Sequence, residues 1–163
     1  MQETPLFTIR YYNSVELMFD YTKLLPAYKR TIRNYRIVSI FCVIMLVLNF
    51  LINGSDVDWV MQGFWLLFSG YVFVVPLLVK NRVGKQFQKD PTHANENVLT
   101  IFEDRIEIDN KVSHASMAYE GILRIAETSI GVHSFFSDVK ALSIPREAVP
   151  EQAFEFLRKK IAI

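Results

Sequence analysis

Two long apolar segments separated by a short polar stretch constrain this chain more than any other feature. The first covers residues 37–52, about 16 residues, and extends at the interfaces to a span of about 36–53. The second covers residues 59–79, about 21 residues without a charged side chain. Roughly 20 apolar residues in a helix cross a hydrocarbon core about 30 Å thick. Because a 163-residue chain cannot surround two helices that are apolar on all sides, we expect a transmembrane hairpin.

Basic residues flank the predicted hairpin on its outer sides only. The loop between the spans contains Asp56 and Asp58 but no Lys or Arg. Short loops rich in Lys and Arg stay in the cytoplasm, so we expect a multi-pass inner-membrane protein with both termini cytoplasmic. The same cations are candidates to contact anionic lipid headgroups. These membrane-orienting residues are Lys29, Arg30, Arg33 and Arg36 before the first span, and Lys80, Arg82 and Lys85 after the second.

Net charge and cysteine content argue against a nucleic-acid partner and against an intramolecular disulfide. The formal net charge is +1, so no overall field favours a nucleic-acid partner. The single cysteine, Cys42, lies inside the first apolar segment and cannot form an intramolecular disulfide. Both observations fit a chain shared between cytoplasm and bilayer.

The N-terminal segment, residues 1–28, is expected to be a cytoplasmic strand and a short helix. Residues 6–12 are β-branched and aromatic, which is typical of a strand. Asn13 or Ser14 can cap a helix that starts near Val15, and Pro26 ends or bends it. A partial apolar face is expected on this helix, made of Val15, Met18, Phe19 and Leu25.

The chain after the hairpin (residues 29–90) changes its pattern. The second helix is expected to continue through Phe87 and to stop before Pro91, where a polar linker begins. Residues 97–163 then alternate with period two and predict an antiparallel meander that curls into a roll or sandwich, covered by a helix after Pro150. The predicted strands are 98–102, 105–109, 112–118, 122–128, 130–136 and 140–144, and the apolar stripe of the helix is Ala153, Phe154, Leu157 and Ile161.

Residues 117–149 carry a resemblance to a known family. The string MAYEGILRIAETSIGVHSFFSDVKALSIPREAV resembles the C-terminal domain of the YcxB-like membrane proteins, with Tyr119 where the family usually has Trp. The resemblance implies a bacterial inner-membrane protein whose cytoplasmic part is of pleckstrin-homology type, and it implies no established activity. The matching positions are Tyr119, Glu120, Ile122, Glu127, Thr128, Phe135, Phe136, Ala141, Ile144, Pro145 and Arg146.

The family motif has a structural interpretation of its own. Pro145 has no backbone donor, so it stands at a strand end, and Ile144 beside it should close the last strand in the core. Arg146 is expected to pair with an acidic neighbour or with a phosphate. We therefore interpret the motif residues as structural: Tyr119, Ile122, Glu127, Phe136, Ile144, Pro145 and Arg146.

No constellation in the sequence indicates catalysis, a cofactor or a metal. The three histidines, His93, His114 and His133, lack metal-ligand spacing, although His114 and His133 would approach one another on facing strands. There is no nucleophile elbow and no phosphate-binding glycine loop. Four carboxylates are interpreted as a solvated hairpin face: Glu103, Asp104, Glu107 and Asp109. Residues 37–52 and 59–79 contain no Asp, Glu, Lys, Arg or His, which argues against a self-contained transporter.

Three functions remain open at this point. The first is a non-enzymatic, membrane-anchored interaction or regulatory module that binds another protein or anionic lipid headgroups. The second is an immunity protein that protects against a membrane-acting toxin. The third is a subunit of an oligomeric channel or transport complex, which Gly63, Ser69 and Gly70 on the second span would favour through homo-oligomer contacts. The expected fold class is an α+β membrane protein, a two-helix hairpin plus a small antiparallel β-domain with a C-terminal helix.

Overall fold

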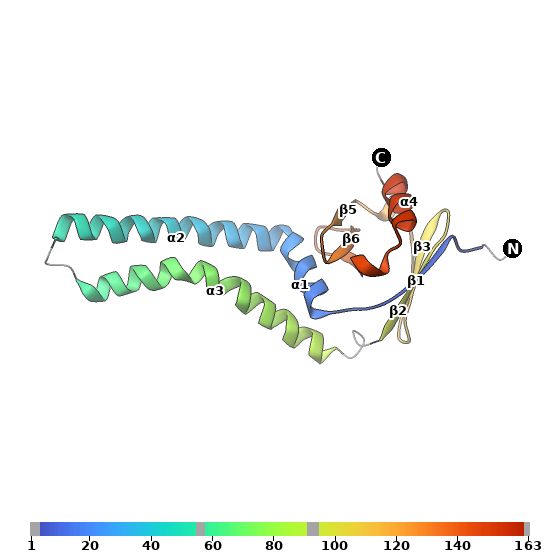
Figure 1. Ribbon diagram of the computed structural model, residues 1–163, viewed down its shortest axis with the longest axis horizontal. Coiled ribbons are helices and arrows are strands. Elements are labelled where there is room, and N and C mark those ends of the chain that lie inside the picture. Colours follow the sequence, from blue (N-terminus) through green and yellow to red (C-terminus); the bar gives the residue numbers. More distant parts are fainter. Residues whose placement is uncertain (1–3, 55–57, 91–94, 162–163) are drawn as a thin grey trace. The chain divides into compact units, whose positions relative to one another are not determined.

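The computed structural model describes residues 4–54, 58–90 and 95–161 (Figure 1). It is an α+β chain with two long apolar helices and two antiparallel sheets. The elements are β1 (Phe7–Tyr12), α1 (Val15–Leu24), α2 (Pro26–Asn53), α3 (Trp59–Lys89), β2 (Glu96–Ile101), β3 (Arg105–Asp109), β4 (His114–Ala118), η2 (Tyr119–Gly121), β5 (Arg124–Glu127), β6 (Gly131–Phe135), β7 (Ala141–Pro145), η3 (Arg146–Ala148) and α4 (Glu151–Ile161).

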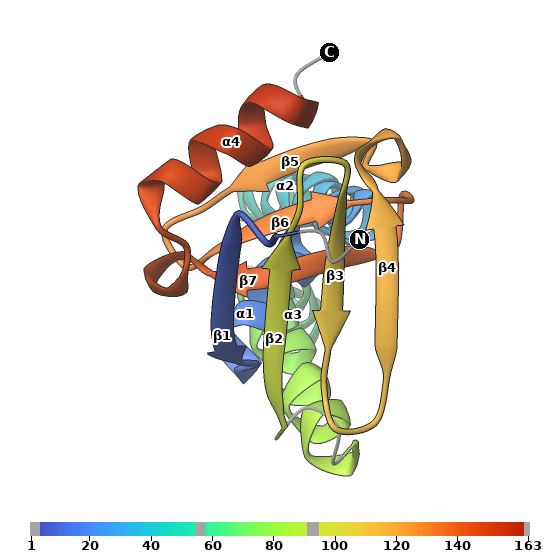
Figure 2. The same cartoon turned by 90° about the vertical axis from the view of Figure 1, so that its right-hand side faces the viewer.

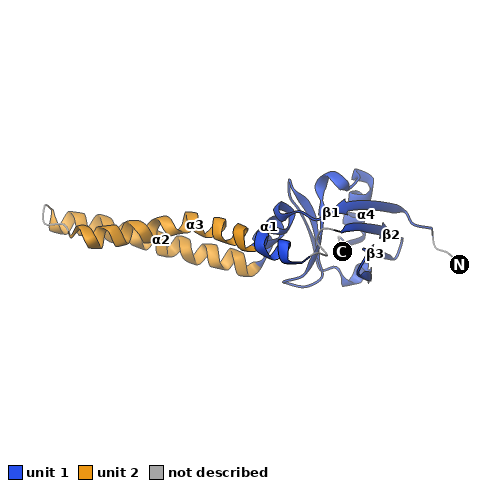
Figure 3. Ribbon diagram, turned by 90° about the horizontal axis from the view of Figure 1, so that it is seen from below, with its two compact units in different colours: residues 1–25, 83–163 blue, residues 26–82 orange. Residues whose placement is uncertain are grey.

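The chain divides into two compact units, coloured in Figure 3. Unit 1 comprises Met1–Leu25 and Val83–Ile163, and unit 2 comprises Pro26–Arg82. Residues 1–28 were expected as a segment of their own, but β1 and α1 belong to the same unit as residues 97–163, and residues 26–28 belong to α2 in unit 2. The helical hairpin is an insertion in the sequence of the β-domain.

One sheet of unit 1 has the strand order β1-β2-β3-β4 (Figure 2). Its first two strands are antiparallel neighbours, with Phe7 opposite Ile101 and Tyr12 opposite Glu96. The second sheet has the order β5-β6-β7, also antiparallel. Below they are called sheet A and sheet B.

The core of unit 1 lies between the inner faces of the two sheets and α4. Alternate residues of each strand point into it, as the period-two pattern predicts. The helix stripe is confirmed in α4, where Ala153, Phe154 and Leu157 are buried. The buried core residues are Ile9, Tyr11, Leu99, Ile101, Ile106, Tyr119, Ile122, Val132, Leu142, Ile144, Val149, Ala153, Phe154 and Leu157.

The first helix, α1, packs on β6 and β7 of sheet B. Of the two predicted cap residues, Asn13 and Ser14, it is Ser14 that caps the helix, since its Oγ accepts from the backbone N–H of Leu17 over 3.1 Å. The predicted partial apolar face was incomplete: Val15, Met18 and Phe19 are half-buried, but the fully buried positions of the helix are Leu17 and Asp20. The reason is that α1 approaches β6 closely at Gly131, where a Cβ atom would collide with the side chain of Leu17.

Unit 2 is an antiparallel helical hairpin. Pro26 starts α2, where its missing N–H costs nothing, and Gly54 follows the helix with a φ of 52°. The Oδ1 atom of Asp58 caps α3 by accepting from the N–H of Val60 over 2.9 Å. At 28 residues, α2 is about 42 Å long, enough to cross a bilayer.

The element boundaries agree closely with the predicted ones. α3 runs on to Lys89 and contains Pro76 in its interior. β4, β5 and β6 are two, three and two residues shorter than predicted, and β7 is shifted by one residue, so that Pro145 is its last residue. The middle of the predicted interhelical loop, residues 55–57, and the centre of the predicted linker, residues 91–94 with His93, lie outside the described residues.

Candidate functional site

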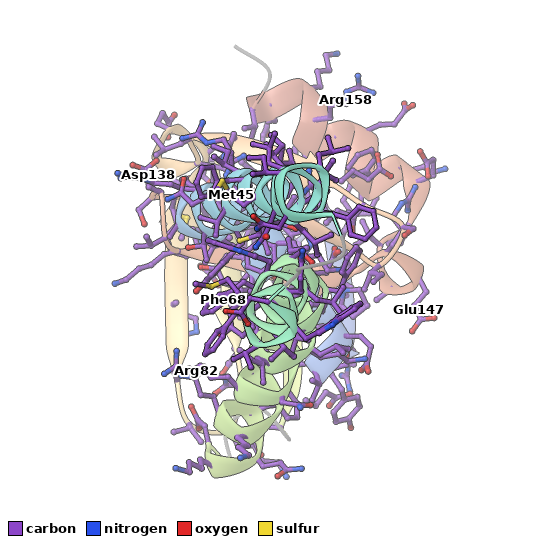
Figure 4. The ribbon with its side chains drawn as sticks, turned by 90° about the vertical axis from the view of Figure 1, so that its left-hand side faces the viewer. Met45, Phe68, Arg82, Asp138, Glu147 and Arg158 are labelled. Carbon is purple, nitrogen blue, oxygen red and sulfur yellow. The ribbon has the colours of Figure 1, made fainter. Side chains whose placement is uncertain are left out.

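The surface of the hairpin is apolar on the outside. Large apolar side chains of both helices are exposed, including Leu51 at 72%, Leu67 at 74% and Phe73 at 77%. Figure 4 draws the side chains that surround α2 and α3, with Met45 and Phe68 labelled on the two helices. In the described part of unit 2, only Cys42 and Val75 expose less than a tenth of their surface.

Polar residues of the spans lie on the seam between the helices instead. Ser39 donates its hydroxyl to the carbonyl oxygen of Ser69 over 2.6 Å, and both side chains are partly buried. The side-chain amide of Gln62 is buried and has no hydrogen-bond partner among the described residues. Aromatic pairs flank the seam, with Tyr35 edge-on to Tyr71 at 5.4 Å between ring centroids. The hairpin thus places polar groups inside and apolar groups outside, the reverse of a water-soluble helix pair.

One end of the hairpin carries all its Lys and Arg residues. Because the helices are antiparallel, the start of α2 and the end of unit 2 in α3 lie at the same end of the pair. Neither α2 nor α3 contains an acidic residue. The seven membrane-orienting residues are all exposed: Lys29, Arg30, Arg33, Arg36, Lys80, Arg82 and Lys85, of which Lys85 belongs to unit 1.

Arg146, the last residue of the family motif, makes several polar contacts in unit 1. Its Nε donates to Oε1 of Glu127 over 2.7 Å, and its Nη2 donates to Oε2 of Glu151 over 2.6 Å. Its Nη1 donates to the carbonyl oxygen of Val149 over 3.2 Å. The hydrogen bonds that Arg146 donates to Glu151, and then to Glu127, raise the pKa of Arg146 above its ordinary value. The acidic partner expected for Arg146 is therefore Glu127 together with Glu151.

The other motif residues lie in or beside the core. Ile122 and Ile144 are buried, and Phe136 packs against the same cluster. The hydroxyl of Tyr119 donates to the carbonyl oxygen of Phe102 over 2.7 Å. Burial, and secondarily the charge of Asp104, raise the pKa of Tyr119 to about 12. Each of these positions contributes packing or a hydrogen bond to the domain.

A hollow of about 680 Å³ lies on the surface of unit 1 between the β2–β3 turn, η2 and the end of α4. We call it the acidic hollow. Carboxylates of Glu103, Asp104 and Glu120 line it, with the ammonium group of Lys160. Apolar side chains complete it, and Leu123 among them is 67% exposed. A surface of this composition suits a ligand that is both cationic and apolar.

A buried polar cluster lies beneath α1. Nε2 of His133 on β6 is 3.1 Å from Oδ2 of Asp20 on α1, and its Nδ1 is 2.9 Å from Oγ of Ser143 on β7. Thr128 donates its hydroxyl to the same Oδ2 over 2.5 Å. His133 is 0% exposed and Asp20 is 7% exposed. We call Asp20, Thr128, His133 and Ser143 the α1 cluster.

The α1 cluster contains serine, histidine and aspartate, but its burial does not suit catalysis. A substrate cannot reach an imidazole that is fully covered by protein. His114, which the sequence left open as a neighbour of His133, lies on sheet A with its Nδ1 3.9 Å from Asp109. Among the described residues no group of three His, Cys, Asp or Glu side chains has the geometry of a metal site.

The sequence analysis missed the α1 cluster and the acidic hollow. The sequence contained one signal for the cluster. Asp20 stands three residues after the apolar Leu17, so the two side chains share one face of the helix. The partners are far apart in sequence, 113 positions in the case of Asp20 and His133, and only the fold brings them together. The hollow likewise combines a turn, a short helix and the end of α4.

Comparison with known proteins finds no match for this chain among family models, curated proteins or solved structures.

Proposed function

We propose that this chain is an integral membrane protein of the bacterial inner membrane that anchors a non-enzymatic interaction module to the cytoplasmic face. The observation that carries the proposal is the reversed polarity of the hairpin, with apolar residues exposed and polar residues such as Ser39 and Ser69 on the seam. Exposed apolar surface of this extent in water would be unfavourable at about 25 cal/mol per Å². Lipid covers it without that cost.

The positive end of the hairpin supports the cytoplasmic assignment of unit 1. All the Lys and Arg residues of α2 and α3 lie toward the ends that join unit 1. By the positive-inside tendency, those ends face the cytoplasm. Unit 1 is then cytoplasmic, and so are both chain ends, which belong to it.

The order of elements in unit 1 supports a pleckstrin-homology type of domain. A four-stranded sheet is followed by a three-stranded sheet and a C-terminal helix, α4. This order of elements is consistent with the pleckstrin-homology type of domain that the resemblance to the YcxB-like family implies. We propose the domain type and the family assignment together. The hairpin lies in the sequence between β1 and β2, so the anchor is built into the domain rather than attached at one end.

Within this proposal, the acidic hollow is the surface that binds the partner. Its carboxylates repel anionic headgroups, so a protein segment with basic and apolar residues fits it better than a lipid does. A photo-crosslinking residue in place of Leu123 is expected to give one discrete adduct in cells. The same residue in place of Val112, which is equally exposed at 66% on unit 1, is the matched control and should give none.

Charge reversal tests whether the adduct depends on the hollow. Glu103→Lys together with Glu120→Lys is expected to abolish the adduct at Leu123. Glu107→Lys together with Asp109→Lys, on the β3 strand outside the hollow, should leave it unchanged. The absence of an adduct at Leu123, or an adduct insensitive to the first pair, contradicts the interaction module at this surface.

Orientation is tested by labelling with a membrane-impermeant maleimide in spheroplasts. In a Cys42→Ala background, Asp58→Cys at the start of α3 is expected to react in intact spheroplasts. Ser116→Cys on β4 is exposed as well but should react only after the membrane is opened. The reverse pattern contradicts the cytoplasmic assignment of unit 1.

A second function, a subunit of an oligomeric complex, is favoured by the small residues of α3. Gly63 and Gly70 have no atom within 4 Å of the place where a Cβ would lie, so each leaves room for another helix. Gly70 also lines a shallow apolar hollow of about 560 Å³ on α3. A strictly monomeric protein by native mass spectrometry in lipid nanodiscs contradicts the homo-oligomeric version of this second function and leaves the first function intact.

A further inference from the structure

The α1 cluster fixes the protonation state of His133 through its partners. The carboxylate of Asp20 only accepts hydrogen bonds, so Nε2, 3.1 Å away, carries a proton. Nδ1 then accepts from the hydroxyl of Ser143 over 2.9 Å. In this arrangement every polar atom of the neutral imidazole is satisfied, and this tautomer is assigned from its partners.

A second proton on the imidazole disturbs this arrangement. Nδ1 becomes a donor, so the hydroxyl of Ser143 must turn and give its own proton to another acceptor. The ring, which is 0% exposed, also acquires a charge without access to water. Burial accordingly lowers the pKa of His133, although the hydrogen bond and the charge of Asp20 act in the opposite direction.

Other groups around the cluster come mainly from α1. Lys23 places its Nζ 3.8 Å from Oδ1 of Asp20 and neutralises part of that charge. The ring of Tyr21 lies 6.4 Å from the imidazole between centroids, and its hydroxyl donates to the carbonyl oxygen of Val139. From the sheet, Thr128 and Ser143 face His133 or its partner, and neither titrates in this pH range.

We propose that α1 is a pH-sensitive latch, docked on sheet B while His133 is neutral and released when His133 gains a proton. Only Leu25 separates α1 from α2 in the sequence, and Asn13 and Ser14 separate it from β1. Release therefore turns residues 13–25 into a tether between the β-domain and α2, and it uncovers the face of β6 and β7 beneath α1. The contacts that carry the proposal all lie within unit 1, and they do not depend on the proposed function.

The direction of the pH effect follows from proton linkage. A histidine freed by release of α1 has a pKa of about 6.5, and the docked one has a lower pKa. Docking is therefore fully stabilised above about pH 6.5 and weakens as the pH falls below it. At pH 5.5 the freed histidine is protonated about ten to one, so the docking equilibrium weakens by up to about tenfold.

Amide hydrogen exchange of the full chain in nanodiscs at pH 7.5 and 5.5 tests the latch. After correction for intrinsic exchange rates, the protection factors of the α1 amides are expected to be up to about tenfold lower at pH 5.5 than at pH 7.5. The amides of β2 and β3, in sheet A, should keep theirs. Unchanged protection of α1, or an equal loss in α1 and in β2 and β3, overturns the proposal.

Two variants separate His133 from other titrating groups. His133→Gln keeps a donor for Asp20 but does not titrate, so α1 should show the same protection at both pH values. His114→Gln, on β4, is the matched control and should behave like the wild type. A pH-dependent loss that persists in His133→Gln overturns the proposal. If His133→Gln does not fold, an NMR titration of the wild type decides, and a His133 resonance that titrates at or above pH 6.5 contradicts the latch.

Discussion

The guanidinium of Arg146, directly after β7, donates from Nε to Oε1 of Glu127, the last residue of β5, over 2.7 Å. β5 and β7 are not neighbours, because β6 lies between them in sheet B. The ion pair therefore joins the two outer strands of the sheet. The second bond of Arg146, to Glu151, reaches the first turn of α4. Two residues of the family motif thus stabilise the arrangement of sheet B and α4.

Arg146→Ala is expected to lower the melting temperature of the protein. The change leaves the carboxylates of Glu127 and Glu151 without their shared cation and removes the guanidinium from the ring of Phe154, 5.1 Å away. Arg146→Lys should recover only part of the loss, since an ammonium group cannot donate to both carboxylates in the same geometry. Thermal unfolding in detergent measures the effect.

Arg10→Ala is the matched control for Arg146. The Nη1 of Arg10 lies 3.9 Å from Glu96, and its side chain is 70% exposed. Exposed pairs of this kind contribute little to stability. A melting temperature that falls equally in both variants contradicts the structural function of Arg146.

Gly131→Ala is expected to destabilise the docking of α1 on sheet B. A Cβ atom at this position would collide with the side chain of Leu17 and come within 2.9 Å of the carbonyl oxygen of Ile144. Overpacking of this kind costs about 1–3 kcal/mol. Gly121→Ala, whose Cβ would meet Met117 at an ordinary 3.6 Å, is the control. Equal free energies of unfolding for the two variants would show that the close approach of α1 has no energetic consequence.

Tyr119→Phe is expected to cost about 1 kcal/mol near neutral pH, because the carbonyl oxygen of Phe102 loses its donor. The difference in the free energy of unfolding between the wild type and Tyr119→Phe should shrink at alkaline pH. The pKa of Tyr119 is raised to about 12, so the folded state holds the phenol proton more tightly than the unfolded state does. The resulting stabilisation is complete below about pH 10 and is lost as the pH rises toward 12. Urea unfolding of both proteins at pH 8 and pH 11 measures the two free energies of unfolding. A difference between the proteins that is the same at both pH values would contradict the prediction.

Much of the fold follows from local sequence patterns. The hairpin was predicted because residues 37–52 and 59–79 are apolar on all sides, which no packing in a small domain accommodates. The strands of residues 97–163 were predicted because their apolar residues alternate. The cap at Ser14 and the position of Pro145 follow from the hydrogen-bonding groups of single residues.

Long-range relationships could not be predicted in the same way. The sequence indicated a strand over residues 6–12 but not its partner, since the choice of β2 depends on how the whole domain closes. The buried position of Asp20 on α1 was missed because burial of a charged residue is favourable here only through its contacts with His133 and Thr128. A histidine on a strand gives no local sign of the carboxylate that it will meet.

The central claim, that lipid surrounds the hairpin, is tested by paired substitutions at two exposed leucines. Leu67→Asp on α3 and Leu123→Asp on unit 1 change side chains that are 74% and 67% exposed. In water both changes would be nearly neutral, whereas an aspartate in the middle of a membrane span costs about 3 kcal/mol of insertion free energy. The measurement is the amount of each protein that stays in the membrane pellet after an alkaline carbonate wash. We predict that the wild type and Leu123→Asp remain in the pellet until detergent is added, and that Leu67→Asp is strongly depleted from it. Wild-type protein in the detergent-free supernatant, or equal pellets for the two variants, would contradict the account.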